Sequence, residues 1–505
     1  MDSGSNISLE RGFDMSDILI PLTVLLPIIG GVLIPVLPFK KLKLMHIYTE
    51  CVVIITSILV AYLLFNKMGV TYDLVRFSGD LSLSLRLDGL GSVFCAMVAF
   101  LWPFVTLYAF EYMKHEGKEH SFFMFFTMTY GVTLGIASSA NLVTMYCFYE
   151  MLTLVTLPLV MHSGSREAVL ASRKYLYYSL GGAAFAFIGL IFMISYGSTD
   201  FAYGGTLNLG LIGNRENILK LVYVMAFMGF GVKAALFPFS EWLPQAGVAP
   251  TPVTGLLHAV AVVKAGAFAT MRLTYYCFGV DFLKGSWAQY VIIGFTVFTI
   301  VYGCSRAIKE THMKRRLAYS TVSNLSYILF SVALMSPLGL IGALCHMICH
   351  AFMKLLSFLC AGAVIVQSEK TFVHQLDGMG KKMPQVFALF TISGLALMGV
   401  PGLGGFLSKW HLVKAAIADG GVAGAIGVGA LLISALLTAN YMMTITVHAF
   451  FKEGNAEDKG SDPTWRMMIP LYLFAAFCYF RSVLCADSFI LRVDCGRIIV
   501  RRGER

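Results

Sequence analysis

The chain has 505 residues, 57% of them hydrophobic and only 13% charged, and its mean hydropathy is +0.75. A soluble protein uses roughly 25% charged residues to cover its surface, so this composition excludes an ordinary water-soluble domain and predicts that lipid covers much of the chain. The formal net charge of +10 does not indicate nucleic-acid binding, because the positive residues lie in short loops between apolar segments.

The chain begins with a polar segment, residues 1–16, which lacks the basic start of a signal peptide. Apolar segments of spanning length then follow one another almost without pause. They predict an all-α membrane protein with about fourteen transmembrane helices. We place these segments near residues 17–38, 45–66, 88–112, 121–138, 140–162, 173–196, 218–238, 249–273, 287–307, 316–337, 340–366, 384–416, 421–451 and 465–485.

Basic residues are concentrated in the loops that follow the odd-numbered segments, for example in residues 39–44, 163–174 and 305–316. Since such loops face the cytoplasm, we expect a multi-pass protein of the cell inner (cytoplasmic) membrane with both termini outside. The arginine-rich tail, residues 481–505, fits this orientation poorly.

Two apolar segments contain residues that interrupt a helix. The first break lies in the run from Lys233 to Pro238, and the second in the run from Gly399 to Lys409. Proline removes a backbone donor, and glycine relaxes the helix. Paired interruptions in two halves of a chain are typical of transporters built from inverted repeats, and ordinary proline kinks are the alternative.

Ionisable residues lie inside the apolar segments, where each costs roughly 2.5–3.5 kcal/mol on insertion scales. Glu150 is the one carboxylate that we identify deep in a span, so we expect it to be the partner of Lys233. Burial favours a neutral lysine and a nearby carboxylate favours a charged one, so such a pair can take up or release a proton as its partner moves. A static ion pair that locks helices together is the alternative. Further lysines lie in or beside apolar runs at Lys264, Lys354 and Lys409.

His346, His350 and Lys354 follow one another at intervals of four residues, which places them on one face of a helix. His258 and Lys264 are six residues apart and do not share a face closely. Histidine titrates near neutral pH, so we expect the histidines to act in a proton relay with the lysines. Hydrogen-bonded core histidines are the alternative.

The segment from Cys345 to His350 has a metal-like pattern of cysteine and histidine. Haem attachment needs two residues between the cysteines, and here there are three. On one helix, the cysteines and the histidines point about 100° apart. We therefore expect no metal and no cofactor in this chain, and we find no disulfide framework and no iron–sulfur spacing among its eleven cysteines.

The run that starts at Lys233 has the sequence KAALFPFSEWLPQAGVAPTPVTGLLHAVAVVKAG. Together with the segments around Glu150, residues 316–327, residues 346–354 and residues 401–409, it closely resembles one family. This family comprises the antiporter-like membrane subunits shared by complex I, membrane-bound hydrogenases, formate hydrogenlyase and multi-subunit Mrp Na⁺/H⁺ antiporters. One departure is Ser240, where many relatives have histidine.

The resemblance implies fourteen core helices with two inverted five-helix repeats. Helices 1–3 would occupy residues 17–120, the first repeat 121–273, the second repeat 287–451, and the last helix with a basic tail 465–505. It also implies that the seventh and twelfth helices are broken, where our two breaks fall. Adding the resemblance to the charge pattern, our candidate proton-transfer residues are Glu150, Lys233, His258, Lys264, His346, His350, Lys354 and Lys409.

The resemblance implies a half-channel from the cytoplasm to Lys233 and Glu150, a central axis through Lys264 and the histidines, and an exit near Lys409. We therefore expect a proton-translocating subunit of a complex I-related, redox-driven pump, with membrane subunits of a hydrogenase- or dehydrogenase-type complex as partners. A subunit of a multi-subunit Mrp-type Na⁺/H⁺ antiporter is the alternative, and a membrane scaffold is a third hypothesis.

Overall fold

The computed structural model describes residues 18–66, 68–77, 81–454 and 459–479. The polar segment 1–16 and the arginine-rich tail 481–505 lie outside the described residues, so their predicted sides of the membrane stay predictions.

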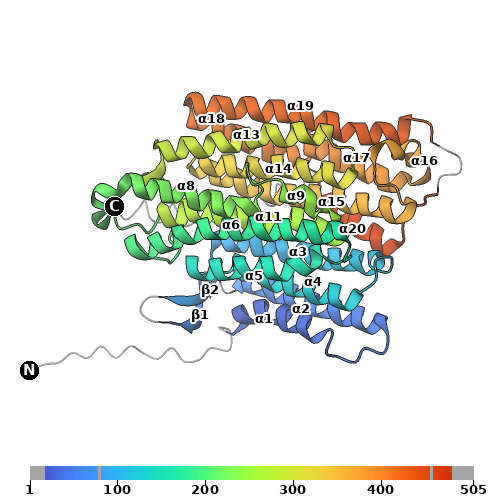
Figure 1. Cartoon of the computed structure of the whole chain (residues 1–505), viewed down its shortest axis with the longest axis horizontal. Helices are drawn as coiled ribbons and strands as arrows, with labels where there is room; N and C mark the ends of the chain where they lie inside the picture. Colours follow the sequence, from blue (N-terminus) through green and yellow to red (C-terminus); the bar gives the residue numbers. More distant parts are fainter. Residues whose placement is uncertain (1–17, 67, 78–80, 455–458, 480–505) are drawn as a thin grey trace, which may run out of the picture.

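Long helices run side by side in one bundle (Figure 1). The helices are α1 (Leu19–Leu33), α2 (Leu42–Asn66), α3 (Gly89–Tyr112), α4 (Glu119–Ala137), α5 (Leu142–Val160), α6 (Arg166–Tyr196), α7 (Leu209–Ile212), α8 (Glu216–Lys233), α9 (Trp242–Gln245), α10 (Thr251–Ala259), α11 (Val262–Arg272), α12 (Val280–Leu283), α13 (Trp287–Lys309), α14 (Met313–Ala333), α15 (Pro337–Ser368), α16 (Met379–Lys382), α17 (Pro384–Met398), α18 (Gly404–Asp419), α19 (Gly421–Phe451) and α20 (Trp465–Phe477).

Each of the predicted apolar segments coincides with a helix or with a pair of helices separated by a break. Within the described ranges, eight helices are long and apolar enough to cross a membrane: α2, α3, α5, α6, the stretch Thr251–Phe278, α13, α15 and α19. Helices α1, α17 and α20 are shorter apolar helices. The multi-pass helical architecture is therefore confirmed, whereas the count of fourteen and the inverted repeats stay predictions.

The helix is interrupted at both predicted breaks. Helix α8 ends at Lys233, and the chain continues through Ala235, which has a left-handed φ of 56°, and a cis Phe237–Pro238 peptide before α9 begins. Helix α17 ends at Met398, where Gly399 adopts a φ of 91° that glycine tolerates without strain. Both interruptions lie beside a candidate lysine.

A third interruption is not predicted by the sequence. The apolar pattern indicates one helix over residues 249–273, but α10 ends at Ala259 and α11 begins at Val262. The amides of Val260 and Ala261 both donate to the carbonyl of Leu256, so the chain forms one wide turn here. The sequence at this point is a run of alanine and valine without proline or glycine, so it carries no local breaker signal.

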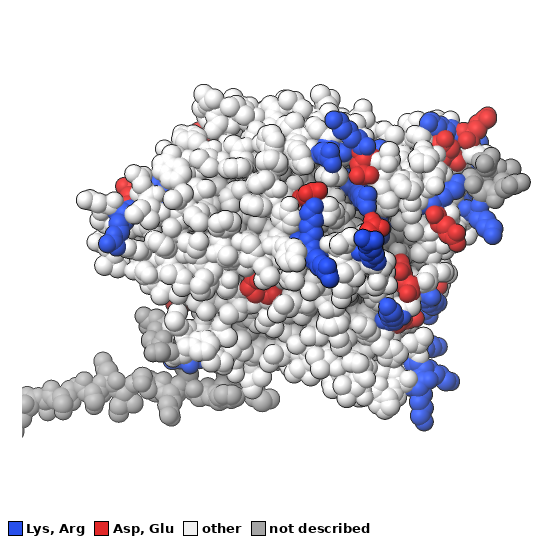
Figure 2. Space-filling model, in the orientation of Figure 1, with Lys and Arg blue, Asp and Glu red and all other residues white. Residues whose placement is uncertain are grey.

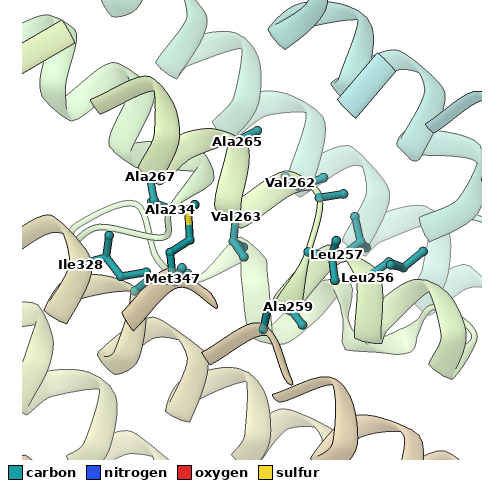
Figure 3. Packing of buried hydrophobic residues seen from close by; sticks show 14 of the residues in the cluster. Ala234, Leu256, Leu257, Ala259, Val262, Val263, Ala265, Ala267, Ile328 and Met347 are labelled. Carbon is teal, nitrogen blue, oxygen red and sulfur yellow. The ribbon is translucent and has the colours of Figure 1, made fainter. Parts of the chain in front are cut away.

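Small apolar side chains fill the centre of the bundle around this third interruption. Figure 3 shows Ala234 and Val263 close to Met347 of α15, with Ile328 of α14 beside them, and these residues are fully buried. Alanine and valine leave room for close helix approach, which membrane helices use in place of a hydrophobic driving force. The titratable side chains described below are thus held between closely packed helices.

One small β-hairpin departs from the predicted all-α fold. Strands β1 (Thr71–Arg76) and β2 (Ser82–Arg86) pair antiparallel, with Tyr72 opposite Leu85. The predicted helices leave this region as a loop, although residues 81–87 alternate strictly between leucine and a polar residue, which is a strand signal. The carboxylate of Asp73 accepts a hydrogen bond from Ser84 at 2.7 Å, which lowers the pKa of this carboxyl.

Charged side chains gather at one end of the bundle. In Figure 2 they lie mainly over the right-hand part of the face, where Figure 1 places α16, and most of the remaining face is uncharged. Large apolar side chains such as Ile58, Leu154 and Leu436 are more than half exposed along the bundle. This combination is the one expected of a protein with a lipid-facing apolar belt.

Candidate functional site

Lys233 and Glu150 meet between α8 and α5. The Nζ of Lys233 lies 3.9 Å from Oε1 of Glu150, and it also donates a hydrogen bond to the carbonyl of Tyr149. The same ammonium lies 3.4 Å from the centre of the Tyr149 ring. The side chain of Lys233 is 1% exposed and that of Glu150 is 24% exposed, so the lysine is inside the bundle and the carboxylate lies at its edge.

The position of Lys233 follows from the local backbone. Lys233 is the last residue of α8, where the negative end of the helix dipole favours a cation. Gly266 of α11 lets the two helices approach closely, because a Cβ at this position would lie 2.6 Å from the amide nitrogen of Ala234. Gly266 is two residues from Lys264, so this contact joins the first candidate lysine to the second.

Lys264 and His350 meet in the middle of the bundle. The Nζ of Lys264 lies 2.9 Å from Nδ1 of His350, and neither residue is exposed. Residues 264 and 350 lie on α11 and α15, so this contact joins the two halves of the chain. The other ring nitrogen of His350, Nε2, is buried without a hydrogen-bond partner among the described residues, and it is free to accept or donate a proton.

His346 continues this series along α15. Its ring centre lies 5.9 Å from that of His350, and its Nδ1 lies 3.0 Å from the hydroxyl of Ser408 on α18. The ring of Tyr327 lies 5.3 Å from the ring of His346, and the Nζ of Lys409 lies 5.3 Å from the centre of the Tyr327 ring. His346 and Lys409 therefore both lie beside the ring of Tyr327.

Lys409 binds the end of the broken helix. Its Nζ donates hydrogen bonds to the carbonyls of Leu397 at 2.7 Å and Met398 at 3.1 Å. These are the last carbonyls of α17, which the helix itself leaves without partners, and the helix dipole is negative there. Lys409 is half-buried.

Two of the candidate residues make no hydrogen bond to the members of this series in the described part of the chain. The Nζ of Lys354 donates to the carbonyl of Leu317 at 3.1 Å, and the ring of His258 lies 4.7 Å from that of Phe358. Both side chains are fully buried, and both ring nitrogens of His258 lack a hydrogen-bond partner in the described part of the chain. His258 therefore makes no hydrogen bond to Lys264 there.

The metal-like cysteine and histidine segment has no common centre. His346 and His350 contact Ser408 and Lys264, which lie on other helices. Within residues 18–66, 68–77, 81–454 and 459–479, no group of three or more histidine, cysteine, aspartate or glutamate side chains is arranged to hold a metal ion. The cofactor prediction is not tested by this geometry.

The structure contains a buried ion pair, between Arg272 and Asp88, that the sequence does not predict. Arg272 donates to both carboxylate oxygens of Asp88 at 2.5 and 2.6 Å, and its guanidinium is fully buried against the rings of Phe201, Phe268 and Tyr276. Arg272 falls at the end of the predicted apolar segment 249–273 and is not among the candidate residues. An arginine directly after an apolar run is the signal that could have placed it inside.

Three further assignments from the sequence were wrong. Lys314 and Arg316, which the sequence places in a loop, lie in α14 and are 8% and 6% exposed. Glu150 is not the one carboxylate within a span, because Glu50 lies inside α2 and its Oε2 is buried without a hydrogen-bond partner among the described residues.

The arrangement brings titratable groups from several helices close to one another. Carboxylate, ammonium and imidazole groups lie in order from Glu150 through Lys233, Lys264, His350 and His346 toward Lys409, and the contacts above join several of them directly. Burial makes the protonation of each group depend strongly on its neighbour's charge. A change in the protonation of one group therefore changes the protonation equilibrium of its neighbour.

Comparison with known proteins identifies the chain's relatives. The family described as NADH:quinone oxidoreductase/Mrp antiporter, TM, matches residues 139–438, and a complex I chain 5 N-terminus family matches residues 76–123. NADH-quinone oxidoreductase subunit N of Desulforudis audaxviator is 31% identical over 375 residues, which cover 73% of each chain. NAD(P)H-quinone oxidoreductase chain 4-3 of Nostoc sp. is 29% identical over 76% of this chain and 69% of its own.

Solved structures share the fold. A chain of the archaeal membrane-bound sulfane sulfur reductase superposes with a TM-score of 0.80 at 22% identity and covers 94% of this chain and 98% of its own. A chain of the Mrp complex from Dietzia sp. superposes with a TM-score of 0.81 at 20% identity and covers 96% of both chains.

Proposed function

The chain belongs to the NADH:quinone oxidoreductase/Mrp antiporter family of transmembrane subunits, and on this premise we propose that it translocates protons across the cytoplasmic membrane. It does so as an antiporter-like subunit of a complex I-related, redox-driven pump. Relatives named as NADH-quinone and NAD(P)H-quinone oxidoreductase components support a redox-driven complex.

One observation carries this proposal: buried titratable side chains from both halves of the chain contact one another. Lys233 meets Glu150 at 3.9 Å, and Lys264 meets His350 at 2.9 Å. Ionisable groups inside a membrane bundle are costly and mark proton or ion pathways. A purely structural role would need one locked pair, whereas here imidazole nitrogens remain open beside the lysines in the described part of the chain.

The mechanism follows from the charges. While Glu150 is ionised, it holds a proton on Lys233 by attraction across 3.9 Å. When Glu150 is neutralised or moves away, Lys233 loses this stabilisation in its buried site and releases the proton toward Lys264. Lys264 transfers it to Nδ1 of His350, whose other nitrogen releases a proton toward His346. Lys409 then receives the proton beside the last carbonyls of α17, to which it donates hydrogen bonds.

The wider assembly is part of the proposal. We propose fourteen transmembrane helices, with residues 121–273 and 287–451 forming two inverted repeats around the breaks after Lys233 and Met398. Other membrane subunits are partners, and electrons pass through partner subunits of the complex, because we assign no cofactor and no metal to this chain. His258 and Lys354 would act as side branches of the relay.

A specific observation keeps the alternative open. The chain is also 29% identical over 407 residues to a probable K(+)/H(+) antiporter component of Rhizobium meliloti, of which it covers 40%. In a Mrp-type antiporter, an ion gradient would supply the driving force in place of electron transfer.

The test is to purify the complex through a tag on this chain and reconstitute it in vesicles that contain a pH-sensitive dye. Proton movement on addition of an electron donor supports the redox-driven pump. Proton movement that needs a sodium or potassium gradient and no electron donor supports the antiporter instead. No proton movement under either condition refutes both. Mass spectrometry of the copurifying proteins identifies the redox partner.

A further inference from the structure

A long groove runs between α2 and α3 on the outside of the bundle, at the edge where Figure 1 places α2. Its volume is about 610 Å³. The lining follows one face of each helix, from Glu50 to Phe65 on α2 and from Ala96 to Leu107 on α3. At a rise of about 1.5 Å per residue, it extends for about 22 Å along α2. We call this feature the α2–α3 groove.

The groove contains one unpaired carboxylate. Glu50 is the only charged residue among the described residues that line it. Its Oε2 is buried, and none of residues 18–66, 68–77, 81–454 and 459–479 gives this atom a hydrogen bond. The polar lining residue Ser57 differs, because its hydroxyl donates to the carbonyl of Val53 at 3.0 Å and lies 2.8 Å from the hydroxyl of Tyr130. Glu50 therefore lacks the donor that its neighbour Ser57 has.

Glu50 lies below the level of the lipid head groups. Lys40, Lys41 and Lys43 lie in or beside the first turn of α2, and lysines of this kind flank spanning helices at the membrane surface. About 10 Å of helix separates Lys43 from Glu50. A carboxylate at this depth is costly unless another side chain pairs with it, and lipid tails have no donor. The charge therefore favours an occupant that carries a cation into the membrane.

The shape of the groove suits another helix. Ala61 on α2 and Ala96 and Ala99 on α3 line the half of the groove away from Glu50, and small side chains allow membrane helices to approach closely. Ile58 and Phe65 project beside them and are 61% and 86% exposed. Such rows of large and small side chains are what a neighbouring helix packs against.

The segment 480–505 of this chain is another conceivable occupant. It follows Tyr479, and the ring of Phe477 lies 5.0 Å from that of the lining residue Phe100. Its sequence does not match the groove, because it contains six arginines and no more than five uncharged residues in a row. In an apolar groove with one carboxylate, most of these arginines would have no partner.

We propose that the α2–α3 groove docks a transmembrane helix of another subunit of the complex, and that this helix presents a lysine or arginine to Glu50. The inference rests on the proposed membership of a multi-subunit complex. It does not depend on which ion the complex moves.

Photo-cross-linking in the full complex, purified through a tag on this chain, tests the docking. A photoactivatable amino acid replaces Ile58 or, as the matched control, Ile55, which is 50% exposed on the same helix but does not line the groove. We expect light to join position 58 to a helix of another membrane subunit, with several-fold less of this product from position 55. Because Glu50 and Ile58 are about two helical turns apart, mass spectrometry should find a lysine or arginine about two turns from the cross-linked residue of that helix.

A second measurement tests the charge. Glu50→Gln keeps the shape of the side chain, and we expect it to lower the amount of the cross-linked subunit that stays bound in detergent by roughly tenfold or more, because the cation of that subunit loses its partner. Glu111→Gln is the control, since Glu111 on α3 pairs with Lys114 at 2.8 Å and does not line the groove. Glu50→Lys, combined with glutamate in place of the cation on the other subunit, should restore binding. The amount of this chain in the membrane, measured in parallel, separates loss of the partner from misfolding.

Cross-links from position 58 that reach only lipid or only residues 480–505 refute the docking proposal. Equal cross-linking from both positions, a cross-linked helix without lysine or arginine, or full retention of the subunit in Glu50→Gln also refutes it. A complex that cross-links as expected but moves no protons refutes the proposed function and leaves the docking proposal intact. A complex that pumps protons but gives only lipid adducts refutes the docking proposal and leaves the proposed function intact.

Discussion

Loss of the Lys233–Glu150 pair should uncouple proton movement from the driving reaction. Lys233→Ala removes the ammonium, Glu150→Ala removes the carboxylate, and Glu150→Gln removes its charge while keeping its shape. In each variant the electrostatic interaction between Lys233 and Glu150 is lost, so the protonation of the remaining partner no longer depends on the charge of the other. We expect proton movement to fall strongly while the complex still assembles.

The magnitude follows from the distance. Two unit charges 3.9 Å apart interact by about 4 kcal/mol at an effective dielectric constant of about 20. Each 1.4 kcal/mol is a factor of ten in an equilibrium constant, so this attraction biases the protonation of Lys233 by roughly a thousandfold. Because the Glu150 side chain is 24% exposed, solvent screening reduces this bias. We therefore expect the rate of proton uptake to fall by roughly tenfold to a thousandfold.

The assay is dye-reported proton uptake in reconstituted vesicles, with electron transfer measured separately. Lys220→Ala is a matched control, because Lys220 lies on the same helix and pairs with Glu216 near the helix start, where the carboxylate is 57% exposed. Such a pair contributes at most about 1 kcal/mol. Normal proton uptake by assembled Lys233→Ala and Glu150→Ala complexes would refute the relay.

Three further outcomes are expected. Lys409→Glu should retain more proton uptake than Lys409→Ala, because a titratable group remains. The resemblance implies lysine or glutamate at this position. Equal losses of proton uptake in the two variants would contradict this prediction. Arg272→Ala should lower the free energy of unfolding by about 3–5 kcal/mol, measured by denaturation in detergent, because it removes the ion-pair partner of the largely buried Asp88 carboxylate. An unchanged transition midpoint would refute the assignment. Gly266→Val should reduce proton uptake strongly, because its Cβ would lie 2.6 Å from the Ala234 amide and force α8 away from α11; normal uptake would show that this approach is dispensable.

The helices and two of the three interruptions were predictable from local sequence. An apolar run of about twenty residues must form a helix in lipid, because every backbone polar group needs a partner. Proline and glycine residues near Lys233 and Lys409 predict the two helix breaks, and this signal is also local in the sequence. The break at Val260 carries no such residue, since it depends on how α10 and α11 fit among their neighbours.

The candidate site was predictable as a set of residue types and only partly as a geometry. The spacing of His346, His350 and Lys354 along one helix is a local property, and it could be obtained without a structure. The pairing of Arg272 with Asp88 and the burial of Glu50 could not be predicted, because the groups that surround them come from other helices.

The sequence by itself determined that this chain spans a membrane repeatedly and carries ionisable groups at a depth where they are costly. The composition and the hydrophobic pattern are properties of local sequence. In lipid, each spanning segment must satisfy its own backbone hydrogen bonds and therefore forms a helix. Only the tertiary structure decided which groups meet. It placed Lys264 beside His350 and paired Arg272 with Asp88. These contacts depend on the packing of helices far apart in the chain, so no single segment contains the information.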